Sequence, residues 1–144
     1  MKATIQDNIA MFKSHMNEIN FKMEENITEK NTFFASNEKT AHGGNIRLIA
    51  SFPFDHNSVD IYCFNLAEIS NPSKREAALN HINDLNINYR YAKFTLSEEG
   101  SVAISLCIDF TDIQFAPELV MRQIMMIYHA ANDEYEQLMK IAWS

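Results

Sequence analysis

The sequence predicts an α+β domain in which an antiparallel β-sheet packs against helices. Three observations lead to this class. Apolar side chains alternate with polar ones in several short stretches, which is typical of strands with one buried face. Three longer stretches instead repeat apolar residues at every third or fourth position, which is typical of helices. Short polar turns join neighbouring strands, so hairpins dominate and the predicted order is α-β-β-β-β-α-β-β-α.

Length and composition indicate a single domain over residues 1–144. Of the 144 residues, 47% are hydrophobic and 22% are charged, an ordinary balance for a globular protein. The net charge of -7 would repel phosphate groups, so we expect no nucleic-acid partner. No run approaches the roughly 18 apolar residues of a membrane span, and the N-terminus lacks an apolar signal core. We therefore expect a cytoplasmic protein without a membrane partner.

The first predicted helix spans residues 4–19. Thr4 and Asp7 have the spacing of a capping box at its start. One narrow apolar stripe, which we expect to lie on the sheet, is formed by Ile5, Ile9, Phe12, Met16 and Ile19.

After this helix the apolar period changes to two. The change predicts a first strand at residues 21–24, a polar turn at 26–31 and a second strand at 32–39. Gly43 and Gly44 then interrupt the pattern, because glycine permits the positive φ angles of tight turns.

The third and fourth strands, at residues 46–54 and 58–66, are predicted to form a hairpin. The third alternates strictly, with apolar residues at Ile46, Leu48, Ala50, Phe52 and Phe54. In the fourth, one face carries Val59, Ile61 and Cys63, and the other carries Tyr62, Phe64 and Leu66. Either a partner or the chain itself could cover that second apolar face.

The second helix is predicted to start at Asn71 and Pro72, because Asn caps helix N-termini and Pro suits the first helical position. It is expected to end within residues 86–89. Its buried side is expected to consist of Ala78, Ile82 and Leu85, with Leu79 beside them.

A second hairpin, turning at Glu99 and Gly100, organises the predicted fold. Its incoming arm alternates at Phe94 and Leu96. Its outgoing arm alternates at Val102, Ile104, Leu106, Ile108 and Phe110. Residues two apart share one face of a sheet, so these side chains form an apolar face that the flanking helices should cover.

The last predicted helix opens at Pro117 and, if unbroken to Trp143, spans about 27 residues or roughly 40 Å. That length exceeds what a small sheet needs, so part of it either reaches another subunit or breaks near residues 130–133. Methionines broaden its apolar face, and Met-rich surfaces adapt to varied partners. The candidate partner or dimer surface is Met121, Met125, Met126, Tyr128, Tyr135 and Met139. The alternative is that these side chains fill the core.

No stretch carries a recognisable catalytic, cofactor-binding or metal-binding motif. The five histidines lack zinc-ligand spacing, and Asp60, Asp109 and Asp112 form at best a weak carboxylate candidate. Cys63 and Cys107 fall on predicted strands and are expected to be buried free thiols, although strands could also place them side by side in a disulfide. We therefore assign no catalytic or metal-binding residue and expect no cofactor.

Residues 77–110 combine several features of one known family. A helix carries paired asparagines, Asn83 and Asn86, in NDLN, and the short turn Asn88-Tyr89-Arg90 follows. Then come the strand YAKFTL, the turn EEG and the apolar strand VAISLCIDF. This stretch resembles the YbjN-like family, described as bacterial sensory-transduction regulators. The resemblance implies a fold similar to type III secretion chaperones, often dimeric, and a binding or regulatory module.

The leading hypothesis is a non-enzymatic, possibly chaperone-like protein that forms a homodimer and binds a protein or peptide segment. Two alternatives stay open. The first is a small metal- or ligand-dependent enzyme assembled from dispersed Asp and His residues. The second is a purely structural assembly protein.

Overall fold

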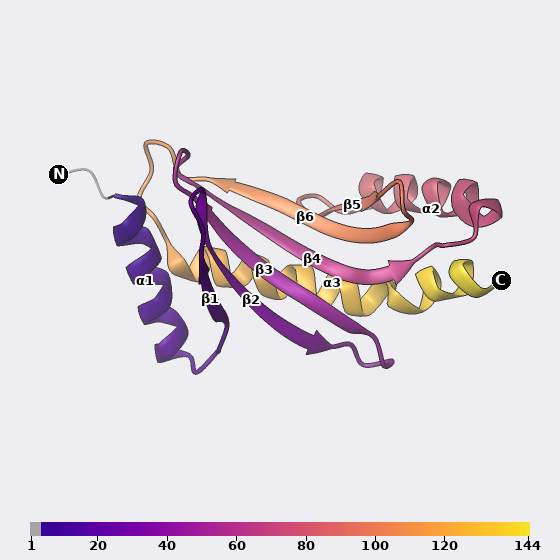
Figure 1. The fold of residues 1–144 in the computed structure, drawn as a ribbon, viewed down its shortest axis with the longest axis horizontal. Helices are drawn as coiled ribbons and strands as arrows, with labels where there is room; N and C mark the ends of the chain where they lie inside the picture. Colours follow the sequence, from indigo (N-terminus) through magenta and orange to yellow (C-terminus); the bar gives the residue numbers. More distant parts are fainter. Residues whose placement is uncertain (1–3) are drawn as a thin grey trace.

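The computed structural model describes residues 4–144 and contains every predicted helix and strand in the predicted order (Figure 1). The elements are α1 (Ile5–Glu18), β1 (Glu24–Ile27), β2 (Asn31–Lys39), β3 (Asn45–Pro53), β4 (Ser58–Glu68), the 3₁₀ turn η1 (Pro72–Lys74), α2 (Arg75–Asn88), β5 (Lys93–Leu96), β6 (Ser101–Asp109) and α3 (Pro117–Trp143).

The six strands form one sheet in the order β1-β2-β3-β4-β6-β5. Each neighbouring pair is antiparallel, which confirms the predicted α+β class and both predicted hairpins. The sheet order departs from the chain order only at β5, which returns to the outer edge of β6 after α2.

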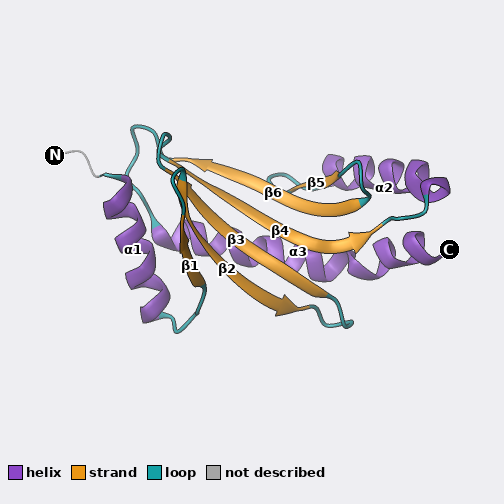
Figure 2. Cartoon of the chain, in the orientation of Figure 1, coloured by secondary structure: helices purple, strands orange, loops and turns teal. Residues whose placement is uncertain are grey.

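The helices contribute to one core on one face of the sheet (Figure 2). α3 runs along the sheet, whereas α1 and α2 lie toward its two ends. Phe12 of α1, Ile82 of α2 and Ile124 of α3 share this core with alternate strand residues such as Phe94 and Ile104. Phe94 and Ile104 are 2% and 0% exposed, so helices roof the apolar face of the second hairpin as predicted.

α1 is held by a cap and an aromatic contact. Thr4 and Asp7 form the predicted capping box, with Asp7 N donating to Thr4 Oγ1 at 3.1 Å and Thr4 N to Asp7 Oδ2 at 3.0 Å. The ring centroid of Phe12 lies 5.2 Å from that of Phe34 and 5.4 Å from that of Phe52. These contacts fix the helix against β2 and β3.

The first strand lies later in the chain than predicted. β1 begins at Glu24 and extends to Ile27, so the prediction of a strand at 21–24 and a turn at 26–31 was wrong. Asn20 adopts a left-handed backbone (φ 57), and Phe21 N donates to the Met16 carbonyl at 3.0 Å. The residues after α1 therefore complete its C-terminal cap before the strand can start.

A β-bulge in β4 corrects the predicted face of Leu66. The register between β4 and β6 shifts between Cys63 and Ala67, and Asn65 has a left-handed backbone (φ 64). As a result Leu66 is 1% exposed in the core, whereas Phe64 stays 38% exposed. The simple alternation inferred from the sequence fails at this point.

α2 follows a 3₁₀ turn that Asn71 caps, since its side chain accepts a hydrogen bond from Ser73 N at 3.0 Å. The predicted buried residues of α2 are buried, but Leu79 is 44% exposed and lies outside the core. Asn86 accepts a hydrogen bond from Phe94 N at 2.7 Å and donates to the Phe94 carbonyl at 3.0 Å. These two bonds fasten α2 to the outer edge of β5.

α3 is one continuous helix of 27 residues, so the break considered near residues 130–133 does not occur. Ala130 and Ala131 are 2% and 0% exposed, and their small side chains allow close packing at that point. Within residues 4–144, no helix is both long and apolar enough to cross a membrane.

Candidate functional site

Helical geometry divides the six residues of the predicted partner or dimer surface into two groups. At about 3.6 residues per turn, five of them fall on one flank of α3, whereas Met126 lies on the opposite flank. The first group is Met121, Met125, Tyr128, Tyr135 and Met139. Met126 shares its flank with Leu119 and Gln123. The structure thus does not bring all six together on one surface.

The first group packs largely within the molecule. Met121 is 7% exposed, and Tyr128 Oη donates to the Lys39 carbonyl at 2.8 Å. The Tyr135 ring covers Gly44, where an added Cβ would come within 2.6 Å of the ring. This flank of α3 therefore supports the end of the β2–β3 hairpin, and its role in binding a partner stays a prediction.

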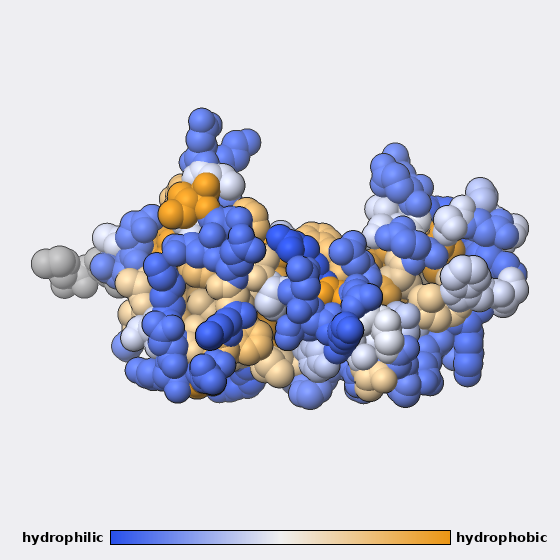
Figure 3. Space-filling view, turned by 60° about the horizontal axis from the view of Figure 1, so that its bottom comes forward, coloured by the Kyte–Doolittle hydropathy of each residue, from blue (hydrophilic) through white to orange (hydrophobic). Residues whose placement is uncertain are grey.

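The outward face of α3 is polar. Its exposed residues include Glu118, Arg122, His129, Asp133, Glu136 and Lys140. α3 therefore presents mostly polar side chains to solvent. In the view of Figure 3, the hydrophobic side chains of the molecule gather in separate patches between hydrophilic ones and do not form one continuous field.

The histidines and carboxylates of the enzyme alternative stay dispersed. His42 Nδ1 lies 2.8 Å from Glu136 Oε1, and His56 Nε2 lies 3.9 Å from Asp55 Oδ2, both pairs being exposed to solvent. Among the described residues, no group of three or more His, Cys, Asp or Glu side chains could hold a metal ion.

Cys107 lies between two of the candidate carboxylates. It is the register partner of Asp60 on β4, and Asp109 follows it on β6. Burial, and then the hydrogen bond and negative charge of Asp60, raise the pKa of the Cys107 thiol to about 11. The side-chain and main-chain hydrogen bonds of Thr111 lower the pKa of Asp109, whose Oδ1 accepts from Thr111 N at 2.8 Å. The site thus holds a protonated thiol and an ionised carboxylate at neutral pH.

The two cysteines differ in environment. Cys63 is buried as predicted, and burial raises the pKa of its thiol to about 12. Cys107 is exposed, so the prediction of two buried thiols was wrong for this residue. Both are free thiols, because Cys63 points into the core and Cys107 points to the opposite face of the sheet.

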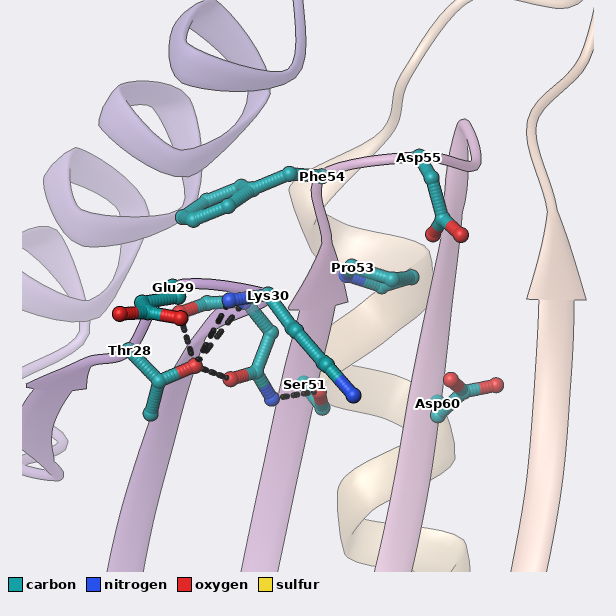
Figure 4. Close-up of a pocket in the computed structure, with 9 residues that line it drawn as sticks. Thr28, Glu29, Lys30, Ser51, Pro53, Phe54, Asp55 and Asp60 are labelled. Carbon is teal, nitrogen blue, oxygen red and sulfur yellow. Dashed lines mark hydrogen bonds between the residues drawn. The ribbon is translucent and has the colours of Figure 1, made fainter.

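A hollow of about 770 Å³ lies beside the β1–β2 turn and the end of β3 (Figure 4). Lys30 N and Asn31 N both donate to Thr28 Oγ1 at 3.1 Å, and Asn31 Nδ2 donates to Ser51 Oγ at 2.8 Å. These polar groups bind one another, so they stabilise the turn and leave few groups for a ligand. The Lys30 side chain extends across the hollow.

A second hollow lies between β6, α3 and the turn before β5. Its volume is about 420 Å³, and we call it the β6 groove. The groove is lined by Arg90, Tyr91, Leu106, Cys107, Ile108, Asp109, Leu119 and Gln123. It thus combines apolar side chains with a few charged and polar ones, which is typical of binding sites.

The edge of β6 is unpaired along this groove. β5 pairs only with residues 102–105 of β6, so residues 106–109 have no strand on that side. Leu106 and Ile108 consequently stay half-buried, whereas Val102 and Ile104, which β5 flanks, are fully buried.

The direction of the main-chain groups follows from the neighbouring hydrogen bonds. Phe110 N donates to the Asn57 carbonyl on the β4 side at 2.8 Å, whereas the Ser101 carbonyl accepts a bond at 2.9 Å from the β5 side. Because this direction alternates along a strand, Cys107 and Asp109 direct their N–H and C=O groups into the β6 groove.

The other edge of the sheet has a comparable free stretch with different side chains. β1 covers residues 32–35 of β2 and leaves residues 36–39 without a neighbour on that side. That stretch carries Asn37, Glu38 and Lys39, and charged side chains discourage pairing with another chain. The β6 edge lacks such protection at Leu106 and Ile108.

The sequence reasoning did not identify the β6 groove. Its signal was the unequal length of the hairpin arms, since four residues of β5 face nine of β6. Leu119 and Gln123 could not be assigned to the groove from sequence, because the packing of α3 against the sheet brings them beside β6.

These features define the class of the protein: an α+β domain with one antiparallel sheet, helices on one face and an open groove at the edge of the sheet. The family model described as "Putative bacterial sensory transduction regulator" matches residues 34–139. The chain therefore belongs to the YbjN family, as residues 77–110 indicated. No curated protein matches the sequence. The family description indicates a regulatory role and names no enzymatic activity.

Proposed function

We propose that this protein is a non-enzymatic regulatory module that binds a polypeptide segment of a partner protein at the β6 groove. Family membership supports a regulatory role. Among the described residues, the histidines are dispersed and form no metal site. The raised pKa of the Cys107 thiol keeps it protonated, which makes it a poor nucleophile. A chaperone-like action, in which the segment belongs to a client protein, is one form of this proposal.

The observation that carries the proposal is the apolar, unpaired edge of β6. Exposed strand edges pair readily with other chains unless charge, a bulge or a covering element prevents it. Here β5 begins only at Lys93, opposite Ser105 of β6, so no strand covers residues 106–109 on that side. The groove therefore offers main-chain groups and apolar surface together, and an extended polypeptide can use both.

Affinity purification from a bacterial host, followed by quantitative mass spectrometry, tests the proposal. The bait would be the wild-type chain and the Ile108→Lys variant, which places a charge in the groove. Ile27→Lys is the matched control, because Ile27 is 71% exposed on the opposite edge strand. We expect a recurrent partner that wild type and Ile27→Lys retain and Ile108→Lys loses. Equal recovery with all three baits would contradict the proposal.

We also propose a homodimer, for which the far end of α3 is the candidate surface. Trp143 is 81% exposed, and it lines an open hollow with Tyr135 and Met139. An exposed aromatic beside other apolar side chains is common at protein interfaces. Light scattering at tens of micromolar should show a dimer in wild type and a smaller species in Trp143→Glu. A wild-type protein that stays monomeric would exclude it.

A further inference from the structure

We propose that the β6 groove binds its partner by strand addition, and that the partner segment alternates apolar with basic side chains. This inference rests on the proposed function and specifies the chemistry of the segment. The apolar side chains would face Leu106, Ile108 and Leu119, and the basic ones would face Asp60 and Asp109.

The main chain of β6 supplies the pairing groups. Cys107 and Asp109 direct N–H and C=O groups away from β4, into the position that β5 occupies further along the strand. An extended segment in that position would continue the ladder of the sheet, as peptides do when they add to a free strand edge. Tyr91, which is 57% exposed, marks the end of this position nearest β5.

The helix-facing side of the groove selects apolar side chains. Leu106 and Ile108 point toward α3 and are only half-buried, and Leu119 of α3 lies beside them. Every second side chain of an added strand would fall on this face and complete the burial of both strand residues. Gln123 also lines the groove, and its buried Oε1 has no hydrogen-bond partner among the described residues. An incoming N–H or hydroxyl group would satisfy this atom.

The opposite side of the added strand would meet negative charge. Asp109 lines the groove on the same face of the sheet as Cys107, and Asp60 lies on that face one strand further away, across from Cys107 in the register of β4 and β6. No lysine or arginine forms an ion pair with either carboxylate within residues 4–144. The lining also holds one cationic side chain, Arg90, in the turn before β5. Further along β6, the two carboxylates and the net charge of -7 favour lysine or arginine at the alternate positions of the segment.

A second copy of this chain fits the edge poorly. The free stretch comprises only residues 106–109, because β5 occupies the edge before it and the chain turns away after it. In a symmetric pairing of two β6 edges, the β5 strand of each copy would meet the turn at residues 110–113 of the other. A separate extended segment carries no such turn and so avoids this obstacle.

Two fluorescein-labelled peptides of equal composition test the chemistry of the segment. One alternates valine and lysine over about nine residues, long enough to span the free edge. The other places all valines before all lysines, so it has the same charge and hydrophobicity without the alternation. We expect fluorescence anisotropy to show tighter binding of the alternating peptide. Equal binding of both, or no binding of the alternating one at millimolar concentration, would overturn the proposed chemistry.

Two proline variants test the main-chain pairing. Cys107→Pro removes an N–H group that points into the groove and that β4 does not use, and Cys107→Ser controls for loss of the thiol. Asn37→Pro is the matched change on the free edge of β2. We expect Cys107→Pro to weaken binding of the alternating peptide about tenfold, roughly the effect of one or two hydrogen bonds. Cys107→Ser and Asn37→Pro should bind like wild type, and equal binding by Cys107→Pro would overturn strand addition.

A backbone-modified peptide tests the same pairing without the proline variant, which could misfold. In an antiparallel ladder, the peptide residues directly across from Cys107 and Asp109 are lysines, and their N–H groups face β6. N-methylation at these lysines removes those donors, while the protein stays wild type. This peptide should bind about tenfold more weakly than its parent, and unchanged affinity would overturn strand addition.

The partner captured in the affinity purification separates the two proposals. A partner lost with Ile108→Lys and also with Cys107→Pro supports both. A partner lost with Ile108→Lys but fully retained by Cys107→Pro leaves the proposed function standing and overturns strand addition.

Discussion

At the scale of single residues, Gly100 shows how one turn fixes the second hairpin. Its φ angle is +94°, and a Cβ at this position would collide with the Ile69 carbonyl oxygen. The Gly100 carbonyl in turn accepts a hydrogen bond from Ile69 N at 2.7 Å. The turn between β5 and β6 therefore lies directly against the end of β4, and the glycine is required for both conformation and space.

Substitution of this glycine should be costly. We expect Gly100→Ala to lower the free energy of unfolding by about 2–4 kcal/mol, since left-handed strain and overpacking each contribute. Gly43→Ala is the matched control, because its φ is +91° but nothing lies within 4 Å of the added Cβ. Strain alone should cost about 1–2 kcal/mol there. Urea denaturation measures both, and equal losses would contradict the role of the Ile69 contact.

The Cys107 thiol offers a second test at this scale. With a pKa of about 11, its thiolate fraction near pH 8 is about a thousandth, so alkylation by iodoacetamide should be slow. Asp60→Asn removes a negative charge that disfavours the thiolate, so the pKa of Cys107 should fall and alkylation should accelerate. The measurement uses a Cys63→Ser background followed by mass spectrometry. An unchanged rate would show that Asp60 does not act on the thiol.

At the scale of elements, Asn86 explains one of the paired asparagines noted in the sequence. Its side chain binds both main-chain groups of Phe94 and so covers the outer edge of β5. Asn83, three residues earlier, is exposed. The two asparagines therefore have different roles, although the sequence presents them as a pair.

We expect Asn86→Ala to lower the free energy of unfolding by about 2–4 kcal/mol, because two main-chain groups near a buried residue lose their partner. Asn83→Ala should change it by less than about 0.5 kcal/mol. Thermal and urea denaturation of the two variants provide the comparison. Similar small effects in both would mean that α2 is held by its apolar side chains alone.

Most elements were predictable because their apolar periodicity is strong, as in β3 and α3. Two of the errors, in the start of β1 and in the face of Leu66, occurred where a single residue takes a left-handed backbone. Asn20 extends the cap of α1 and delays β1, and Asn65 forms the bulge that turns Leu66 into the core. Such positions change the face or start of a strand, yet the periodicity on either side gives no sign of them.

At the scale of the whole molecule, one core joins all three helices to the sheet. We propose on this basis that the chain is a single domain. Thermal unfolding should accordingly give one cooperative transition, with coincident curves from far-ultraviolet and near-ultraviolet circular dichroism. Two separated transitions would indicate that α1 or the α2–β5 unit folds independently.

The candidate site was less predictable than the fold. The apolar face of the second hairpin was predicted, including Leu106 and Ile108, but its incomplete cover was not. That property depends on where β5 begins, where α2 docks and how α3 crosses the sheet. The unequal hairpin arms indicate the first, but the other two are tertiary facts that no local pattern in the sequence encodes.

The position of Cys107 also allows the alignment of a docked chain to be measured by disulfide crosslinking. In an antiparallel ladder, the residue directly across from it in a docked chain would have its Cα about 5.5 Å away. That separation suits a disulfide bond. Cysteines introduced one at a time along a captured ligand would then crosslink under mild oxidation only at the matching site, and the pattern would record alignment and polarity without a crystal.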